Sequence, residues 1–113
     1  MIPKIIEGLP ESILLHGERG EGETWVTIDG EYLNLNLSLK IYNHSPTGFN
    51  WGYGGSGPAQ LSLAILLEFL PVKLAEKYKS EFKRKVISVI KEDVFTVAIP
   101  FRQIIYEIAR IYM

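Results

Sequence analysis

Residues 58–70 constrain the fold most, because they are apolar on nearly every side of the helix that they would form. Their apolar members are Leu61, Leu63, Ala64, Ile65, Leu66, Leu67, Phe69 and Leu70. A helix without a polar face has to be buried all round, so other elements must surround this one. Pro58 suits the first helical position, which makes Gly57 or Ser56 the expected cap.

Three segments before this helix favour antiparallel strands. Residues 12–16 form an apolar run that ends in a glycine-rich turn at 17–22, and residues 24–28 are β-branched and aromatic. The Asp29-Gly30 pair predicts a two-residue hairpin turn, since a type I′ turn needs positive φ at both central positions. In residues 33–41, Leu or Ile alternates strictly with polar residues, which predicts a third strand with one buried face.

The C-terminal half favours helices around one further strand. Residues 72–91 repeat apolar side chains at spacings of three and four, which predicts an amphipathic helix with a basic outer face. Residues 94–98 suit a short strand, and Pro100 opens a last helix with one apolar side. Strands followed by helices indicate an α+β fold, in which an N-terminal antiparallel β-meander packs against two or three helices.

Composition narrows the class of protein. The 113 residues suit a single domain over 1–113. The absence of Cys excludes disulfides and thiolate-bound metals, and only His16 and His44 remain as soft ligands, so we expect neither a metal site nor a cofactor. The longest apolar stretch, about 13 residues, is too short to span a bilayer. We therefore expect a cytoplasmic protein without membrane contact, and the Ile content and lack of Cys lean towards a thermophilic source.

The most unusual segment runs from Asn43 to Leu61. It reads Asn-His-Ser-Pro-Thr-Gly-Phe and, after Asn50, Trp-Gly-Tyr-Gly-Gly-Ser-Gly-Pro-Ala-Gln-Leu. This string resembles the signature of a family of small uncharacterised bacterial and phage proteins, a domain of unknown function. Looser similarity covers most of the chain beyond its first ten residues. The resemblance implies a phage or bacterial accessory protein and carries over no catalytic residue.

The glycines of this segment lead directly into the buried helix, which favours an anion-binding site. Backbone N–H groups of residues 54–59, reinforced by the helix dipole, can surround an anion. The loop aromatics would offer stacking faces, its polar side chains would contact the ligand, and Arg19 would supply a cation. The candidate ligand-binding residues are Arg19, His44, Ser45, Trp51, Tyr53, Gly54, Gly55, Ser56, Gly57 and Gln60. We expect non-catalytic binding of a small anionic or nucleotide-like ligand at residues 43–60.

Two other roles for this loop remain open. Glycines among aromatic residues are also typical of a chain that packs tightly across a core, without any ligand. Alternatively, the aromatic loop is the interface of a protein–protein or homo-oligomeric module. A third hypothesis is weak nucleic-acid binding through residues 72–91, whose net charge is +5. The whole-chain charge of −1 argues against it, and residues 1–31, with a net charge of −5, offer an acidic counterpart.

Known catalytic and nucleotide motifs fit poorly. Residues 52–57 match G-x-G-x-x-G, but a dinucleotide site also needs a preceding parallel strand and a second βαβ unit. A P-loop would need a Lys after the glycines. Ser56 lacks the last glycine of a nucleophile elbow, because Pro58 occupies that position. The protein is therefore expected to have no catalytic residues, and we lean against an enzyme.

Overall fold

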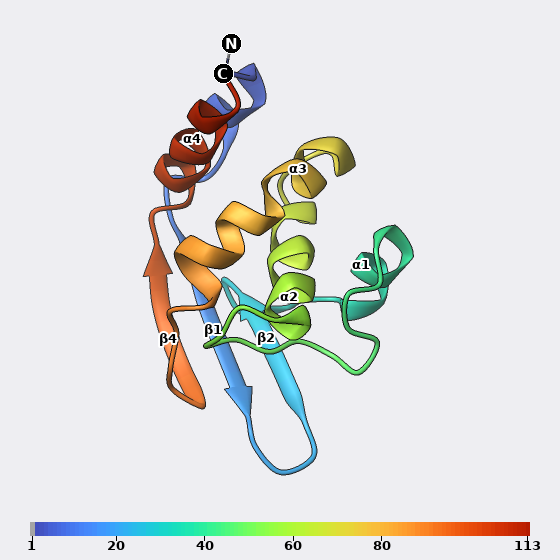
Figure 1. Cartoon of the computed structure of the whole chain (residues 1–113). Coiled ribbons are helices and arrows are strands. Elements are labelled where there is room, and N and C mark those ends of the chain that lie inside the picture. The colour runs from blue at the N-terminus through green and yellow to red at the C-terminus, as the bar shows by residue number, and fades with distance from the viewer. Residues whose placement is uncertain (1) are drawn as a thin grey trace.

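The computed structural model describes residues 2–113 and contains an antiparallel sheet with the strand order β3-β2-β1-β4 (Figure 1). The strands are β1 (Ile13–Arg19), β2 (Thr24–Ile28), β3 (Glu31–Tyr32) and β4 (Val94–Ile99). Asp29 and Gly30 both have positive φ, 50° and 86°, which confirms the predicted hairpin turn. The last strand returns to pair with β1, so the first strand of the chain lies inside the sheet.

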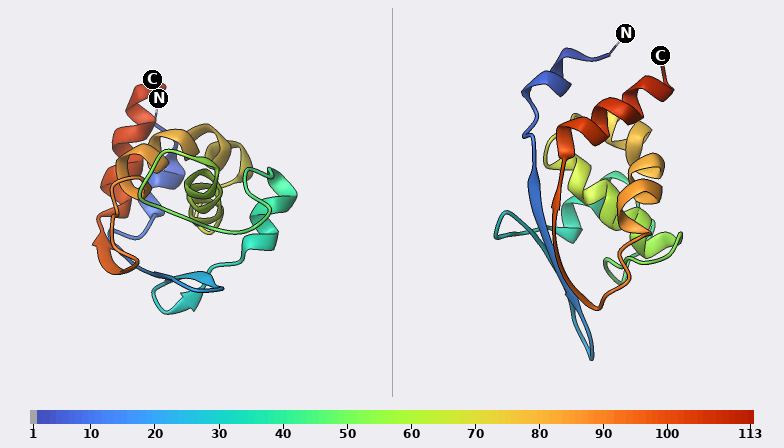
Figure 2. Two further views of the ribbon diagram at one scale, coloured as in Figure 1. Left: turned by 60° about the horizontal axis from the view of Figure 1, so that its bottom comes forward. Right: turned by 90° about the vertical axis from the view of Figure 1, so that its left-hand side faces the viewer.

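The helices lie on one face of this sheet and leave the other bare (Figure 2). They are η1 (Lys4–Gly8), α1 (Leu35–Ile41), α2 (Ser56–Leu67), α3 (Val72–Phe82), η2 (Lys83–Ile87) and α4 (Phe101–Ile111). The predicted α+β class is confirmed, as is the helix that follows Pro100. The helix predicted over residues 72–91 begins at residue 72, but α3 ends at Phe82 and η2 continues it only to Ile87. Across residues 2–113, no helix is both long enough and apolar enough to cross a membrane.

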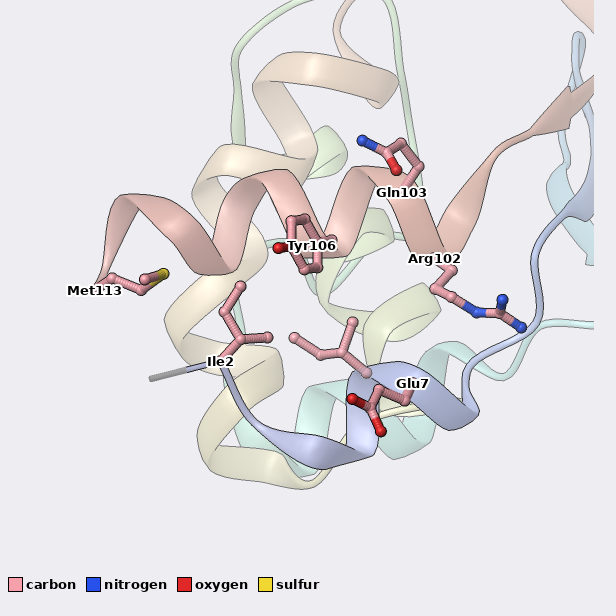
Figure 3. Close-up of a pocket in the computed structure, with 7 residues that line it drawn as sticks. Ile2, Glu7, Arg102, Gln103, Tyr106 and Met113 are labelled. Carbon is pink, nitrogen blue, oxygen red and sulfur yellow. The ribbon is translucent and has the colours of Figure 1, made fainter.

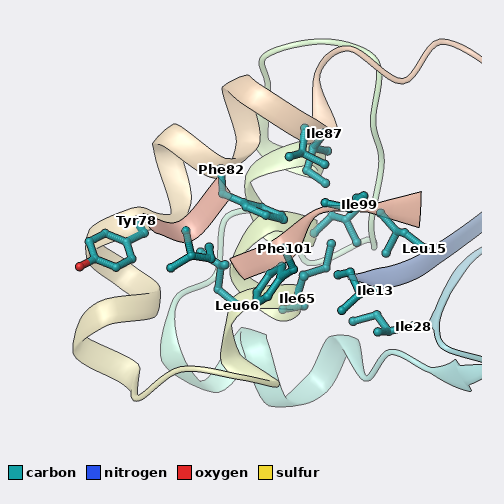
Figure 4. Close-up of a cluster of buried hydrophobic side chains, with 14 of the residues drawn as sticks. Ile13, Leu15, Ile28, Ile65, Leu66, Tyr78, Phe82, Ile87, Ile99 and Phe101 are labelled. Atoms are coloured by element: carbon teal, nitrogen blue, oxygen red, sulfur yellow. The ribbon is translucent and has the colours of Figure 1, made fainter. Parts of the chain in front are cut away.

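The core lies between the inner face of the sheet and α2, as predicted from the apolar character of that helix. Leu61, Leu63, Ile65 and Leu66 are fully buried. Figure 4 shows side chains from α2, α3, α4 and the sheet meeting in one cluster. The helix begins slightly earlier than expected, because Gly55 is its N-cap and Pro58 lies within its first turn.

The predicted third strand over residues 33–41 is wrong. The strand ends at Tyr32, and Leu35–Ile41 form α1. Asn34 caps this helix by accepting a hydrogen bond from the Leu37 N–H. The helical turn exposes Leu37 and buries Ser38 completely, the reverse of the strand pattern. Leu is a good helix former, so its alternation with polar residues did not require a strand.

The predicted glycine-rich turn also begins too early. Gly17, Glu18 and Arg19 belong to β1, which is longer than the apolar run that predicted it. A Cβ on Gly17 would lie 2.4 Å from the Phe95 ring and 3.1 Å from the Trp51 ring. Gly17 therefore lets two large aromatic residues pack directly against the strand.

Candidate functional site

Trp51 anchors the glycine-aromatic loop in the core. Its side chain is fully buried, and its indole N–H donates a hydrogen bond to the Glu92 carbonyl at 2.8 Å. The ring meets Phe95 edge-on, with ring centroids 4.9 Å apart. The expectation that Trp51 offers a stacking face to a ligand therefore fails, because no part of the ring is accessible.

Arg19 supports the loop through hydrogen bonds from its side chain. Its Nε donates to the Asp93 carboxylate at 2.9 Å, and its Nη1 donates to the Asn50 side-chain carbonyl and to the Trp51 backbone carbonyl, both at 2.7 Å. The guanidinium also lies over the Trp51 ring. These contacts occupy the Arg19 side chain, so we assign it to the support of the loop and not to a ligand.

Gly52 ties the same loop to the connection between η2 and β4. Its N–H donates to the Ile87 carbonyl at 3.0 Å, and its carbonyl accepts from Lys91 Nζ at 2.9 Å. Its φ is +86°, and a Cβ would lie 2.7 Å from the Ile90 carbonyl oxygen. Both the backbone conformation and the close approach therefore require glycine here.

Gln60 fixes the other end of the loop from within α2. Its side chain is fully buried, and its carbonyl oxygen accepts from the backbone N–H groups of His44 and Ser45 at 2.7 and 3.0 Å. Its amide group donates to Ser38 Oγ at 2.8 Å and to the Tyr42 carbonyl at 3.1 Å. Gln60 thus joins α1, the loop and α2, and its polar atoms are used in this network.

His44 stacks on Tyr42, with ring centroids 4.2 Å apart. Among residues 2–113, no group forms a hydrogen bond with its buried Nε2. Burial, followed by the positive charges of Lys79 and Lys83, lowers the pKa of His44 below its usual 6.5. His44 is therefore neutral at pH 7, so it brings no positive charge to an anion.

The loop and the start of α2 enclose a pocket of about 310 Å³. Hydroxyl and amide side chains form much of its wall, and no carboxylate lines it. The lining residues are Thr24, Ser45, Thr47, Gly48, Phe49, Asn50, Tyr53, Ser56 and Gly57. The turn of residues 45–48 closes one side, and within it the Gly48 N–H donates a hydrogen bond to the Ser45 carbonyl at 3.5 Å.

The N-terminus of α2 forms the floor of this pocket. No side chain caps the helix, because its N-cap is Gly55, and the first turn carries no acidic residue. A Cβ on Gly57 would lie 2.6 Å from the Asn50 Cβ and 3.2 Å from the Tyr53 hydroxyl, so glycine lets the loop cross close above the helix. The backbone N–H groups at this end have the partial positive charge that favours anions.

The structure divides the ten candidate residues into two groups. Ser45, Tyr53, Ser56 and Gly57 meet in the pocket, and Gly54 and Gly55 lie in the turn that leads into it. The remaining four hold or stack within the loop without lining the pocket; they are Arg19, His44, Trp51 and Gln60. Five further residues line it and were not among the ten candidates; they are Thr24, Thr47, Gly48, Phe49 and Asn50. Thr24 lies on β2, and nothing in the sequence relates it to the loop.

Another cavity and a polar surface cluster lie away from this pocket. A second cavity of about 410 Å³ lies between η1 and α4 and contains no candidate residue (Figure 3). On the bare face of the sheet, His16 lies 2.6 Å from the Thr96 hydroxyl and 2.9 Å from the Glu18 carboxylate, an open surface network to which we assign no catalysis. Among residues 2–113, no three His, Asp or Glu side chains are grouped to hold a metal ion.

The basic outer face of α3 is partly used within the fold. Lys77 lies over the Tyr112 ring and Lys79 over the Tyr42 ring, at 5.0 and 4.2 Å from the ring centroids. Arg84 pairs with Glu81 one turn away. None of the ion pairs in the described part of the chain joins this face to the acidic residues before β3.

Comparisons with curated proteins and with solved structures each found no match. The model of a family of unknown function, DUF6166, matches residues 15–107. This range contains every residue that lines the loop pocket and leaves out η1, which forms one wall of the second cavity. The chain therefore belongs to the DUF6166 family.

Proposed function

We propose that this protein binds a small oxyanion, without catalysis, in the pocket between residues 45–57 and the start of α2. The observation that carries this proposal is the chemistry of the pocket wall: hydroxyl and amide groups, with no carboxylate, surround a helix N-terminus that no side chain caps. Such a site offers hydrogen-bond donors to an anion without a neighbouring negative charge to repel it.

The donors are held in place before a ligand arrives. Ser45 lines the pocket, is only 8% exposed, and is fixed by the hydrogen bond from its backbone N–H to Gln60. Ser56 begins a helix whose body is buried in the core. A hydroxyl can turn its hydrogen towards an anion oxygen, and a rigid donor set lowers the entropic cost of binding.

The ligand class is narrower than the sequence suggested. A nucleotide would need a cation for its phosphate groups, but Arg19 is bound to the loop and no Lys or Arg lines the pocket. The pocket suits a tetrahedral oxyanion such as phosphate or sulfate, free or as part of a small metabolite. Without a cation in the wall, we expect weak binding of the free ion, with a Kd on the order of 1 mM.

An NMR titration of the ¹⁵N-labelled protein with inorganic phosphate, at constant ionic strength, tests this proposal. We expect saturable shifts of the Ser56 and Gly57 backbone amides, because these lie at the helix N-terminus. Ser45→Ala and Ser56→Ala should each weaken binding several-fold by removing one donor. Ser80→Ala on the exposed side of α3 is the matched control and should change nothing. Linear, non-saturating shifts spread over the surface would contradict the proposal.

A further inference from the structure

The two edges of the sheet differ in how they are protected. One edge, β3, has only two residues, and one of them is Glu31. The other edge, β4, reads Val-Phe-Thr-Val-Ala-Ile, without a charge, a proline or a glycine. In Figure 1, no element of the described chain lies on the outer side of β4. Soluble proteins usually shorten, charge or cover an edge strand, so β4 is an unprotected edge.

The pairing with β1 defines which backbone groups point outward from this edge. The Arg19 N–H donates to the Asp93 carbonyl at 2.9 Å, and the register then continues as Glu18 opposite Val94. Because hydrogen-bonded and non-bonded pairs alternate in an antiparallel ladder, Phe95, Val97 and Ile99 bond to β1. The outward residues are therefore Val94, Thr96 and Ala98, whose N–H and C=O groups point away from the sheet.

An apolar groove runs beside these free groups, between β4 and the chain that leaves η2. This groove consists of two cavities, of about 490 and 210 Å³, which share Val89, Ile90 and Val97 as lining residues. Val89 and Val97 are 61% and 38% exposed. Glu92 lines one end of the groove and Lys85 the other, and neither takes part in an ion pair within residues 2–113.

We propose that β4 pairs with β4 of a second copy of this chain, antiparallel, about a two-fold axis at Thr96. In this register, Thr96 lies opposite Thr96 of the second copy, and Val94 lies opposite its Ala98. Each of the outward residues then gains a hydrogen-bonded partner. The two-fold axis closes the assembly as a dimer with one continuous sheet.

Charge and packing select this orientation. The antiparallel arrangement sets the Glu92 end of each groove against the Lys85 end of the other, so opposite charges meet. The axis is perpendicular to the sheet, which places both helical layers on the same side. Val89 and Val97 of the two copies therefore face one another across the axis, and their exposed surfaces become buried. This surface is separate from the loop that the sequence suggested as an interface.

Sedimentation velocity over a concentration series tests the proposal. We expect a reversible monomer–dimer equilibrium for the native chain. Val97→Lys places two like charges next to the axis and should raise the dissociation constant about tenfold or more. Leu37→Lys is the control, because Leu37 is 53% exposed on α1, away from β4. A native chain that stays monomeric throughout, or a dimer that Val97→Lys leaves intact, would overturn the proposal.

Cysteine cross-linking tests the register and does not depend on the folding of Val97→Lys. The chain has no Cys of its own. Directly opposed residues of a hydrogen-bonded pair have Cα atoms about 5.5 Å apart, which a disulfide can bridge. Thr96→Cys should therefore form a disulfide-linked dimer under mild oxidation. Leu14→Cys, exposed on the interior strand β1, should remain monomeric.

A mixture of Val94→Cys and Ala98→Cys should give the mixed disulfide, while Val94→Cys alone should give little. Equal cross-linking of Thr96→Cys and Leu14→Cys would show random collision and would overturn the pairing. Efficient cross-linking of Val94→Cys with itself would overturn the proposed register.

Discussion

Replacing Gln60 with leucine should open the loop that forms the pocket. Leucine has nearly the volume of glutamine, so the packing of α2 changes little. The substitution removes all four hydrogen bonds of the Gln60 side chain at once. The partners left behind are two backbone N–H groups, one hydroxyl and one carbonyl, and they belong to α1 and the loop.

The burial of these partners determines how much stability the Gln60→Leu variant loses. The bonds to the Ser45 N–H and to Ser38 Oγ are buried, so water cannot replace them. The Ser38 hydroxyl keeps its hydrogen bond to the Leu35 carbonyl, so the Ser45 N–H is the buried group that loses its partner. Each buried group left without a partner costs about 1–3 kcal/mol. The bonds to His44 and Tyr42 are only partly buried, so water can replace them and their loss costs little stability. We expect a loss of about 1–3 kcal/mol, which for a domain of this size lowers Tm by about 4–12 °C.

Urea unfolding followed by circular dichroism measures this loss. Gln103→Leu is the matched control, because Gln103 is exposed on α4, and it should stay within about 0.5 kcal/mol of the native protein. If Gln60→Leu is as stable as Gln103→Leu, the buried network does not hold the loop, and Gln60 does not make the pocket rigid.

Three further predictions concern the loop. Gly57→Ala should cost about 1–3 kcal/mol, because its Cβ would lie 2.6 Å from a loop side-chain carbon, whereas Gly54→Ala has open space and should be neutral in the same urea titration. Arg19→Lys should cost about 1–2 kcal/mol in thermal melts, since lysine cannot reproduce three directed hydrogen bonds, and the exposed Arg110→Lys should cost almost nothing. The native chain should lose stability as pH falls from 6.5 through the lowered pKa of folded His44, because the unfolded state takes up the proton first. His44→Phe, which keeps a ring on Tyr42, should flatten that part of the stability–pH curve; an unchanged slope would contradict the assignment.

Local sequence patterns predicted correctly those elements whose pattern is compatible with one structure. The apolar residues of α2 could only be buried all round, and Asp29-Gly30 could only make a tight hairpin turn. The prediction for residues 33–41 was wrong because their alternating pattern is compatible with both a strand and a helix. Helix formation exposes Leu37, but it turns Ser38 inward to the Gln60 amide, a contact between residues far apart in the sequence.

The same reason explains why only some of the candidate ligand-binding residues lie together in the structure. Ser45, Tyr53, Ser56 and Gly57 come together because the loop leads directly into α2, which the sequence shows. Arg19 was expected to contact the ligand, but in the structure it bonds to Asp93. This bond depends on the pairing of β1 with β4, which no local sequence pattern reveals. Trp51 was expected to be accessible, but Gly17 leaves the space in which its ring is buried.

A crystal of the protein soaked in selenate, measured at the selenium absorption edge, tests the oxyanion site most directly. We expect one anomalous peak in the pocket, within hydrogen-bond distance of the Ser45 hydroxyl and the backbone N–H groups of Ser56 and Gly57. A pocket without a peak, in crystals where selenate reaches other surface sites, would contradict the proposed function.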